Sequence, residues 1–260
     1  MTEALSRLDG TSSARRHFRY FDYVMAAFVA ILLLSNLIGA SKLAAVDLSA
    51  LVGVSSWLPW HWLLTGNKLL YGAGILFFPV SYVIGDVLTE VYGYANARRC
   101  VWMGFAAMAF MAFMSWVVVT LPAADGWGGQ AAYESVFGST WRIVAASMIA
   151  FWAGEFVNSF VLAKMKILTQ GKHLWSRTIG STFFGQAVDS AIFYPIAFLG
   201  IWSNEQVLMV MVTNWFLKVV WEALLTPVTY AVVSWLKARE GVEVFDSGTD
   251  FSPFAKADAI

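Results

Sequence analysis

The stretch FDYVMAAFVAILLLSNLIGAS, from Phe21 to Ser41, contains a single charged residue, Asp22. An α-helix needs about 20 mostly apolar residues to cross the hydrocarbon core of a bilayer. The stretch therefore predicts a membrane-spanning helix near the start of the sequence. No small-residue cleavage site followed by a soluble domain comes after it, so it does not have the form of a secretory signal.

Five further stretches have the same apolar character. They are Leu70–Tyr92, Cys100–Leu121, Trp141–Ala163, Ile179–Trp202 and Val207–Leu236. The composition agrees, because 59% of residues are hydrophobic and 13% are charged, against about 25% charged in a soluble domain. We therefore expect an all-α integral membrane protein with a bundle of six transmembrane helices. A soluble enzyme, a disordered scaffold and a nucleic-acid binder are disfavoured.

Basic residues are concentrated in the segments that would lie on one side of this bundle. Those segments hold Arg7, Arg15, Arg16, Arg19, Arg98, Arg99, Lys164, Lys166, Lys172, Arg177, Lys237, Arg239 and Lys256. The positive-inside rule makes this side cytoplasmic, so both termini should face the cytoplasm across a bacterial inner membrane. We expect a cytoplasmic segment over residues 1–20, a six-helix domain over 21–240 and a cytoplasmic tail over 241–260, with residues 1–20 and 245–260 poorly ordered.

The segment Leu43–Leu69 is apolar but interrupted, among others by Asp47 and Pro59. Its three tryptophans, Trp57, Trp60 and Trp62, suit the aromatic belt at a membrane surface. We interpret the segment as an interfacial or re-entrant loop. A seventh span is the alternative, although it would weaken the charge bias downstream.

Polar side chains inside the predicted spans are the candidates for function, because burying an ionisable group in hydrocarbon is costly unless it is paired or neutralised. The spans contain five acids and one base, namely Asp86, Glu90, Glu155, Asp189, Glu222 and Lys218. Spacings of three or four residues place them on the same helix faces as Tyr82, Asn158, Gln186 and Asn214. Four helices would thus present polar stripes to one interior. The excess of acids indicates either protonated carboxyls or a ligand that is cationic or rich in donors.

Some of these residues also allow purely structural interpretations. Lys218 and Glu222 at i, i+4 could form a self-neutralising pair, and Asn36 and Asn158 could join helices by hydrogen bonds. Glu90 lies close in sequence to Arg98 and Arg99, which favours a positioning salt bridge. Asp86, Glu155 and Asp189 have no base in register on their own helix and are the leading ligand candidates.

The candidate residues therefore fall into two groups. The substrate-binding candidates are Asp86, Glu155, Asn158, Gln186, Asp189, Lys218, Glu222, Asn36 and Tyr82, and the gating or positioning candidates are Glu90, Arg98, Arg99 and Pro79. Proline inside a span frees backbone groups, as in the interrupted helices of transporters, and Pro195 and Pro227 have the same effect. The many aromatic residues in these spans suit a flat, nitrogen-rich heterocycle.

Several catalytic and cofactor motifs are absent from the sequence. There is no G-x-x-x-x-G-K-[ST] phosphate loop, no H-E-x-x-H motif and no Cys/His cluster, so no metal or cofactor is expected. A single cysteine, Cys100, excludes a disulfide framework. An intramembrane aspartyl enzyme that uses Asp86 and Asp189 stays open as an alternative, although the first glycine of a G-x-G-D motif is missing before Asp86.

One run of residues carries a family resemblance. The sequence FPVSYVIGDVLTEVYGY at residues 78–94, followed by Ala97-Arg98-Arg99, resembles the queuosine precursor transporter family, formerly grouped as vitamin uptake transporters. Further matches are Ser35-Asn36 with Lys42, Gly154-Glu155 with Asn158, Phe184-Gly185-Gln186 with Asp189-Ser190, and Lys218-Val219 with Glu222 and Pro227. The likeness covers roughly residues 20–240.

The resemblance implies a six-helix importer of 7-deazaguanine precursors of queuosine, chiefly 7-cyano-7-deazaguanine and 7-aminomethyl-7-deazaguanine, which serve tRNA modification. It implies no enzyme activity. A vitamin-type substrate-binding subunit that borrows an energising partner is the alternative within the same class. The acids would permit proton coupling, and the small residues Ala106, Ala107 and Ala109 would permit a homodimer face.

Overall fold

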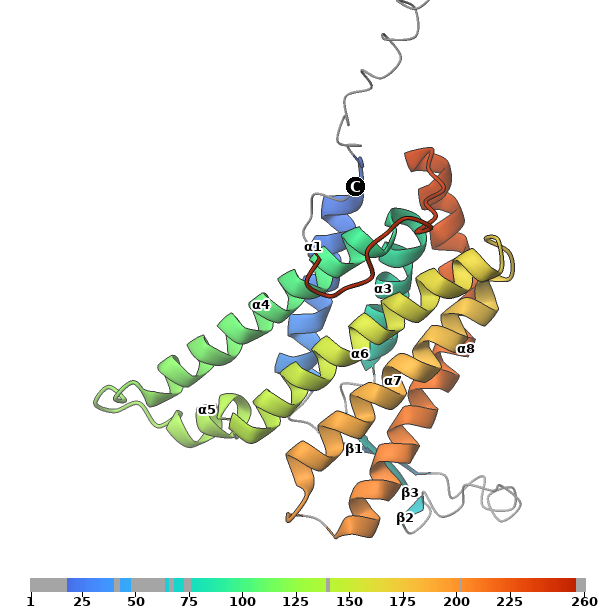
Figure 1. The fold of residues 1–260 in the computed structure, drawn as a ribbon. Helices are drawn as coiled ribbons and strands as arrows, with labels where there is room; N and C mark the ends of the chain where they lie inside the picture. Colours follow the sequence, from blue (N-terminus) through green and yellow to red (C-terminus); the bar gives the residue numbers. More distant parts are fainter. Residues whose placement is uncertain are drawn as a thin grey trace, which may run out of the picture.

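The computed structural model describes residues 18–39, 43–47, 64–65, 68–72, 76–138, 141–201 and 203–255. In this part of the chain, long helices lie side by side as a bundle (Figure 1). The helical elements are α1 (Phe21–Leu34), which continues as the π-helical turn η1 (Ser35–Gly39), α3 (Phe78–Tyr92), α4 (Tyr94–Thr120), α5 (Gln130–Phe137), α6 (Trp141–Leu168), α7 (Leu174–Phe198) and α8 (Asn204–Glu240).

Four helical stretches of the described residues are long and apolar enough to cross a membrane. They are Phe21–Ile38, Tyr94–Thr120, Gln130–Leu168 and Val210–Glu240. The chain is thus a multi-pass membrane protein. The other two predicted spans correspond to α3, which has 15 residues, and to α7, whose 25 residues include Arg177, Gln186 and Asp189. These two helices carry much of the polar interior described below.

The second span was predicted over Leu70–Tyr92, and the predicted start of this helix is wrong. Residues Lys68–Gly72 form strand β3, and helix α3 begins at Phe78. Pro79 therefore lies in the first turn of α3, where backbone N–H groups have no acceptor within the helix, so the N–H that proline lacks is not needed. Pro79 thus does not interrupt a span. Pro195 and Pro227 do lie inside helices, in α7 and α8.

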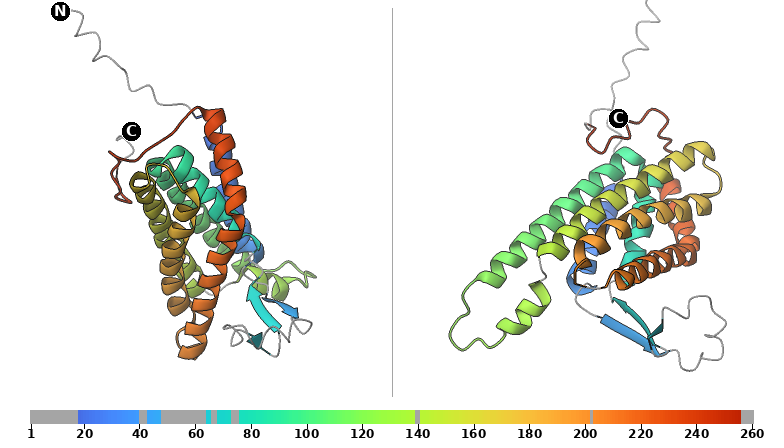
Figure 2. Two further views of the ribbon diagram at one scale, coloured as in Figure 1. Left: turned by 90° about the vertical axis from the view of Figure 1, so that its right-hand side faces the viewer. Right: turned by 60° about the horizontal axis from the view of Figure 1, so that its bottom comes forward.

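The predicted loop Leu43–Leu69 contains paired strands where the structure describes it. Strand β1 (Leu43–Asp47) is antiparallel to β3, from Leu43 opposite Gly72 to Asp47 opposite Lys68, and β2 (Leu64–Thr65) pairs with the other edge of β3. Such pairing satisfies backbone groups in segments too short to span as helices. The sheet lies beside the lower part of α8 (Figures 1 and 2). The three tryptophans of the predicted loop, and Lys42, lie outside the described residues.

Helices α6 and α7 pack closely along their length, and α8 packs on α7 and α3. Two glycines permit the approach of α6 and α7. A Cβ atom added to Gly185 would lie 2.7 Å from Cβ of Asn158 and 2.9 Å from the carbonyl oxygen of Gly154. Small residues let membrane helices approach until their backbones touch, so Gly154 and Gly185 set the register between two helices that carry polar stripes.

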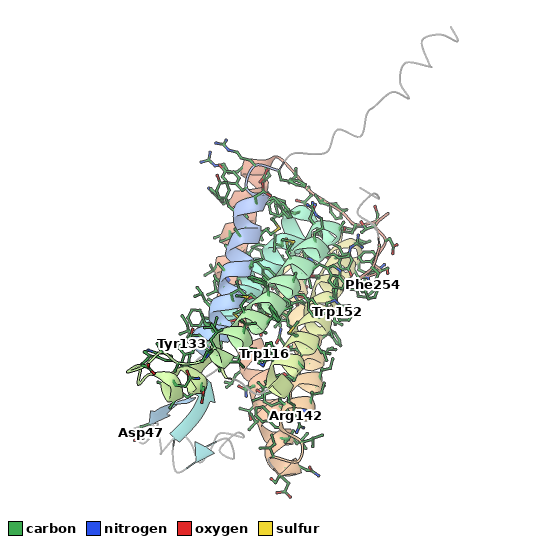
Figure 3. All side chains as sticks on the ribbon, turned by 90° about the vertical axis from the view of Figure 1, so that its left-hand side faces the viewer. Asp47, Trp116, Tyr133, Arg142, Trp152 and Phe254 are labelled. Atoms are coloured by element: carbon green, nitrogen blue, oxygen red, sulfur yellow. The ribbon has the colours of Figure 1, made fainter. Side chains whose placement is uncertain are left out.

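Helix α1 begins at the end of the bundle where α8 finishes. The backbone N–H groups of Arg19 and Tyr20 donate to the Glu240 carboxylate at 2.9 and 2.7 Å. Figure 3 shows Trp152 and Phe254 toward this end, and Arg142 and Asp47 toward the opposite end. The beginning of α1 and the end of α8 therefore lie at the same end of the bundle.

Residues 241–255, called the tail below, fold back across the ends of α3 and α4 (Figure 1). The Asp246 carboxylate accepts the backbone N–H of Tyr94 at 3.0 Å, at the beginning of α4. The Tyr94 hydroxyl donates to the carbonyl oxygen of Phe251, and the ring of Phe254 lies 5.9 Å from that of Trp152. The expectation of a poorly ordered end is thus wrong for residues 245–255, because aromatic and capping side chains anchor them. Residues 1–17 and 256–260 lie outside the described part.

Candidate functional site

A hydrogen-bonded network joins α3, α7 and α8 in the interior of the bundle. The Tyr82 hydroxyl donates to Oε1 of Gln186 at 2.9 Å. The Lys218 ammonium donates to the same Gln186 oxygen at 2.9 Å and to Oδ2 of Asp189 at 2.8 Å. Four of the predicted site residues thus meet at one place, each of them from a stripe identified by its helical spacing.

This network corrects two expectations about charge pairing. Lys218 forms its ion pair with Asp189 on the neighbouring helix, although the i, i+4 spacing suggested Glu222. Asp189 therefore has a basic partner after all. Spacing along one helix detects neighbours only on that helix, whereas the packing of α7 against α8 supplies the partner across the interface.

A second pair lies between α3 and α6. Asn158 donates from Nδ2 to Oδ1 of Asp86 at 3.0 Å, and both residues are buried, at 2% and 0% exposure. Oδ2 of Asp86 and Oδ1 of Asn158 are buried without a hydrogen-bond partner among the described residues. The pair therefore presents two acceptor atoms that no described donor satisfies.

Glu155 and Glu222 supply further unsatisfied acceptors. Within the described part of the chain, Oε2 of Glu155 and both carboxylate oxygens of Glu222 are buried and lack a hydrogen-bond partner. A Cβ atom on Gly85 would lie 3.3 Å from Oε2 of Glu155, so this carboxylate rests against the backbone of α3 beside Asp86. Because an unpaired charge in a low-dielectric interior is strongly unfavourable, these carboxyls need a proton or an incoming donor.

Polar residues also extend from this cluster along α7 and α8. Asn214 donates to the Tyr194 hydroxyl at 2.6 Å, one helical turn before Lys218. On α7, Thr182 and Ser190 flank Gln186 at spacings of four, and their hydroxyl oxygens are buried without a partner in the described structure. Neither hydroxyl is among the candidates predicted from the sequence, although Ser190 belongs to a segment that carries the family resemblance. Their spacing from Gln186 is the signal that could have found them.

Glu90 is bound by three basic residues from three helices. Its Oε1 lies 2.9 Å from Nη2 of Arg177, 2.7 Å from Nζ of Lys237 and 3.4 Å from Nζ of Lys166. The prediction that Glu90 pairs with Arg98 or Arg99 is therefore wrong. The chain turns at Gly93, with φ 84°, and the basic pair that follows is directed toward the tail and α1. The ion pairs of Glu90 thus connect α3 with α6, α7 and α8.

The tail joins this ion cluster through Glu243. Its carboxylate lies 3.1 Å from Nζ of Lys166 and 2.7 Å from Nζ of Lys237. Partial burial of Glu243 raises its pKa, but the hydrogen bonds from Lys237 and Lys166 outweigh that effect and hold the pKa below its ordinary value. The ion cluster thus closes one end of the helices that carry the candidate site.

Asn36 lies apart from this interior. In η1, its Nδ2 donates to the carbonyl oxygen of Leu32 at 2.9 Å and faces Sδ of Met108 on α4 at 3.5 Å. It lines a largely apolar cavity of about 490 Å³ between η1, α4, α5 and α6.

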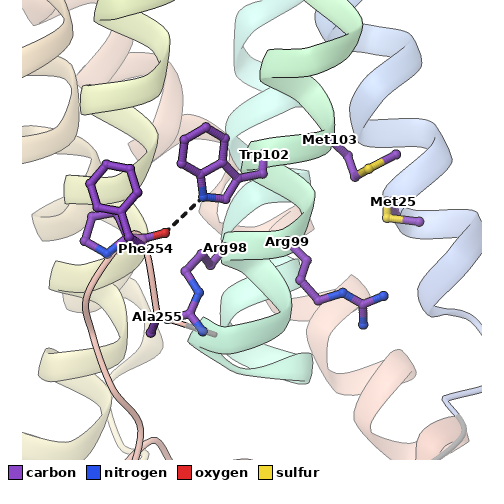
Figure 4. A pocket seen from close by; sticks show the side chains of 8 residues that line it. Met25, Arg98, Arg99, Trp102, Met103, Phe254 and Ala255 are labelled. Atoms are coloured by element: carbon purple, nitrogen blue, oxygen red, sulfur yellow. Dashed lines mark hydrogen bonds between the residues drawn. The ribbon is translucent and has the colours of Figure 1, made fainter. Parts of the chain in front are cut away.

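A second cavity, of about 560 Å³, opens beside Arg98 and Arg99 (Figure 4). Both cavities are lined by residues outside the acidic cluster, which comprises Asp86, Glu155, Asp189 and Glu222.

No group of three or more His, Cys, Asp or Glu side chains is arranged to hold a metal ion in the residues that the structure describes. The donor set is instead made of carboxyls, amides, a phenol and one ammonium. Such groups recognise an organic solute with several N–H donors and a carbonyl.

The chain is similar in sequence to several known proteins. A family model described as "Putative vitamin uptake transporter" matches residues 72–232. A Bacillus subtilis protein named "Probable queuosine precursor transporter" is 31% identical over 168 residues, which cover 64% of this chain and 70% of that protein. The "Queuosine precursor transporter" of Escherichia coli is 28% identical over 125 residues, 48% of this chain and 54% of that protein.

A Haemophilus influenzae protein, also named "Probable queuosine precursor transporter", is 26% identical over 125 residues, 48% of this chain and 51% of that protein. No solved structure matches the chain. The family match covers α3 to most of α8, including every helix of the acidic cluster. The chain therefore belongs to the family described as "Putative vitamin uptake transporter", and the three similar bacterial proteins are likewise named as transporters.

Proposed function

We propose that this protein imports 7-deazaguanine precursors of queuosine, namely 7-cyano-7-deazaguanine and 7-aminomethyl-7-deazaguanine, into the cytoplasm. The observation that carries the proposal is the set of buried acceptors on Asp86, Asn158 and Glu155 that have no hydrogen-bond partner among the described residues, next to the network of Tyr82, Gln186 and Lys218. The names of the similar bacterial proteins point to the same class of substrate.

The chemistry of a guanine-like edge matches these groups. Such an edge offers a ring N–H and an exocyclic amine side by side, and one carboxylate can accept both hydrogen bonds. Asp86 and Glu155 supply that carboxylate, since each keeps a buried oxygen without a described partner. The amide N–H groups of Asn158 or Gln186 then donate a hydrogen bond to the carbonyl oxygen of the substrate. The aminomethyl compound is cationic, and the acidic cluster compensates its charge.

Asp189 has a different role in this proposal. Because its carboxylate is held by Lys218 at 2.8 Å, it orients the ammonium toward Gln186 and fixes the direction of the amide. The Asp189–Lys218 side chains are 21% and 13% exposed, whereas Asp86 is fully buried. The pair thus lies nearer the accessible edge of the cluster, where a solute would arrive first.

The proposal includes six membrane crossings with both termini in the cytoplasm of a bacterial inner membrane. Support comes from the basic residues at the ends of the helices where the tail lies, including Arg98, Lys166, Arg177 and Lys237. A reporter fused after residue 260 should be active only as a cytoplasmic reporter. Activity of a periplasmic reporter at that position would contradict the orientation.

We expect uptake of the solute to be coupled to the movement of protons. Glu222 is fully buried, and neither of its oxygens has a partner in the described residues, because the neighbouring Lys218 is bound to Asp189. A carboxyl in this position takes up and releases a proton as access alternates. Glu222→Gln should therefore preserve binding but abolish the sensitivity of uptake to an uncoupler. Unchanged sensitivity in Glu222→Gln would contradict the role of Glu222, and wild-type uptake that an uncoupler does not affect would contradict proton coupling and favour a partner-energised importer.

The direct test is uptake of labelled 7-cyano-7-deazaguanine by cells that lack their own synthesis and transport of the compound. The wild-type protein should restore uptake. Glu155→Gln should lose the paired acceptors, which costs a few kcal/mol, or roughly 100-fold in affinity. Glu134→Gln on α5 is the matched control, because Glu134 is exposed and bonds only locally, to Gln130. Failure of the wild type to restore uptake would reject the function, whereas normal binding by both Glu155→Gln and Asp86→Asn would reject the site.

A further inference from the structure

A cavity of about 560 Å³ lies beside the first turns of α4, and none of the acidic-cluster residues is among those that line it. Side chains from three segments line it, as Figure 4 shows. They include Met25 of α1, Arg98, Arg99, Trp102 and Met103 of α4, and Phe254 of the tail. The transport proposal makes no use of this cavity.

Two arginines make one wall of the cavity cationic. Arg98 is buried and donates from Nη1 to the carbonyl oxygens of Asp250 and Ser252 at 2.8 and 2.9 Å. Arg99 is exposed, with its guanidinium 5.8 Å from the centre of the Phe21 ring. Neither arginine has a carboxylate partner within 4.0 Å among the described residues. Their positive charge is therefore available to an anion.

The remainder of the cavity is apolar, and two of its side chains are unusually exposed. Met103 is 54% and Phe254 70% exposed. Trp102 donates its indole N–H to the carbonyl oxygen of Pro253 at 3.0 Å, so its one polar atom is satisfied and its rings remain as an apolar surface. Among the described residues that line the cavity there is no carboxylate side chain. A small inorganic anion would leave these apolar groups uncovered.

The position of the cavity matches the boundary between water and hydrocarbon. Arg98, Arg99, Trp102 and Met103 lie within the first ten residues of the candidate span Tyr94–Thr120, that is within about 15 Å of its end. Tryptophan is enriched at that depth, and arginines there reach phosphate groups while their aliphatic stems remain in the apolar region.

We propose that this cavity binds an anionic phospholipid. The phosphate pairs with Arg99 and with the free edge of Arg98, and the first part of an acyl chain lies along Met25 and Met103. Basic pockets beside membrane helices on the cytoplasmic side suit anionic headgroups. The described lining residues include no acidic side chain that would pair with the cationic group of a zwitterionic lipid. This proposal depends on the membrane location of α4 and is independent of the transported substrate.

A bound lipid would also hold the tail in place, because Phe254 and the two carbonyl groups bonded to Arg98 belong to the tail. The lipid would thereby connect α1, α4 and the segment that closes the ion cluster around Glu90. Lipid binding should consequently raise the thermal stability of the protein.

The test uses the full chain, purified in detergent, with four additives, namely phosphatidylglycerol, phosphatidylcholine, glycerol 3-phosphate and inorganic phosphate. Native mass spectrometry measures retained lipid and thermal unfolding measures the shift in Tm. We expect retention and a raised Tm with phosphatidylglycerol alone. An equal effect of phosphatidylcholine would overturn the role of charge, and an equal effect of either soluble phosphate would overturn the role of the apolar wall.

Variants separate the cavity from general surface charge. Arg99→Gln should weaken phosphatidylglycerol binding about tenfold, as expected for one lost charge-assisted hydrogen bond, and Phe254→Ala should weaken it through the apolar wall. Arg239→Gln is the matched control, because Arg239 is also exposed, with its guanidinium 5.9 Å from the Trp235 ring, but does not line the cavity. Wild-type affinity in Arg99→Gln, or an equal loss in Arg239→Gln, would overturn the proposal.

Discussion

Nζ of Lys218 lies 2.8 Å from Oδ2 of Asp189, so that α8 and α7 are joined by an ion pair inside the bundle. The same ammonium donates to Gln186, which also accepts a hydrogen bond from Tyr82 of α3. Glu222, one turn further along α8, is left without a hydrogen-bond partner in the described structure. The pairing across the helix interface, and not along α8, therefore determines which carboxyls remain available.

The first prediction follows from this pairing. Lys218→Met and Asp189→Asn should each lower the Tm in detergent, because removing one member of a buried pair typically costs about 3–5 kcal/mol and partial exposure reduces that cost. The double variant Lys218→Met with Asp189→Asn should recover much of the loss. Recovery in Lys218→Met with Glu222→Gln instead would show that Lys218 pairs along its own helix.

The second prediction concerns the ion cluster around Glu90. Glu90→Gln removes the carboxylate that faces Lys166, Arg177 and Lys237 and should destabilise the protein by about 3–5 kcal/mol, since basic groups are left buried beside one another. Thermal unfolding measures the effect. Glu243→Gln is the control, because Glu243 is 47% exposed and its loss should cost about 1 kcal/mol or less. Equal effects of the two substitutions would contradict the central position of Glu90.

The third prediction is a dependence of stability on pH through Glu243. Its pKa in the folded protein is lowered by Lys237 and Lys166, below the value of about 4.3 in an unfolded chain. The stabilisation is therefore fully present above the unfolded pKa and is lost as the pH falls through the folded pKa. The difference in Tm between the wild type and Glu243→Gln should shrink as the pH is lowered from 6 to about 3. A constant difference would mean that the carboxylate charge does not stabilise the tail.

The fourth prediction concerns the contact between α6 and α7. A methyl group on Gly185 would lie 2.7 Å from Cβ of Asn158 and 2.9 Å from a backbone oxygen, so Gly185→Ala must push the helices apart. Overpacking of this kind costs about 1–3 kcal/mol and should also weaken substrate binding, since Asn158 and Gln186 adjoin the contact. Gly128→Ala is the control, because nothing lies within 4 Å of its added Cβ. Unchanged Tm and unchanged uptake in Gly185→Ala would show that the helices separate without cost.

Sequence spacing predicted which helix faces carry the candidate site, but not the pairing on those faces. Tyr82, Gln186, Asp189 and Lys218 share one network as expected, because an interior position is forced on polar groups in hydrocarbon. The partners of Glu90 come from positions 76 to 147 residues away in the chain. Nearness in sequence suggested Arg98 and Arg99 instead. The relative register of the helices depends on close contacts such as that between Gly154 and Gly185, which no single-helix pattern contains.

Residues that leave the regular helical pattern were harder to predict. Lys68–Gly72 continues an apolar run into α3 but pairs as a strand with Leu43–Asp47, since pairing depends on a second segment and not on local hydropathy. Likewise, the polar composition of the tail gave no sign that Asp246 accepts the N–H group at the start of α4. Both features depend on contacts between distant segments.

The cap on α4 implies an order of events during synthesis. Asp246 follows Tyr94 by 152 residues, so all the long helices of the bundle have been synthesised before this carboxylate joins the chain. Until then, the first turn of α4 keeps an unsatisfied N–H group, and the ion cluster around Glu90 lacks Glu243. The helices can therefore still adjust against one another while the chain grows, and their arrangement becomes fixed only after translation has passed the tail.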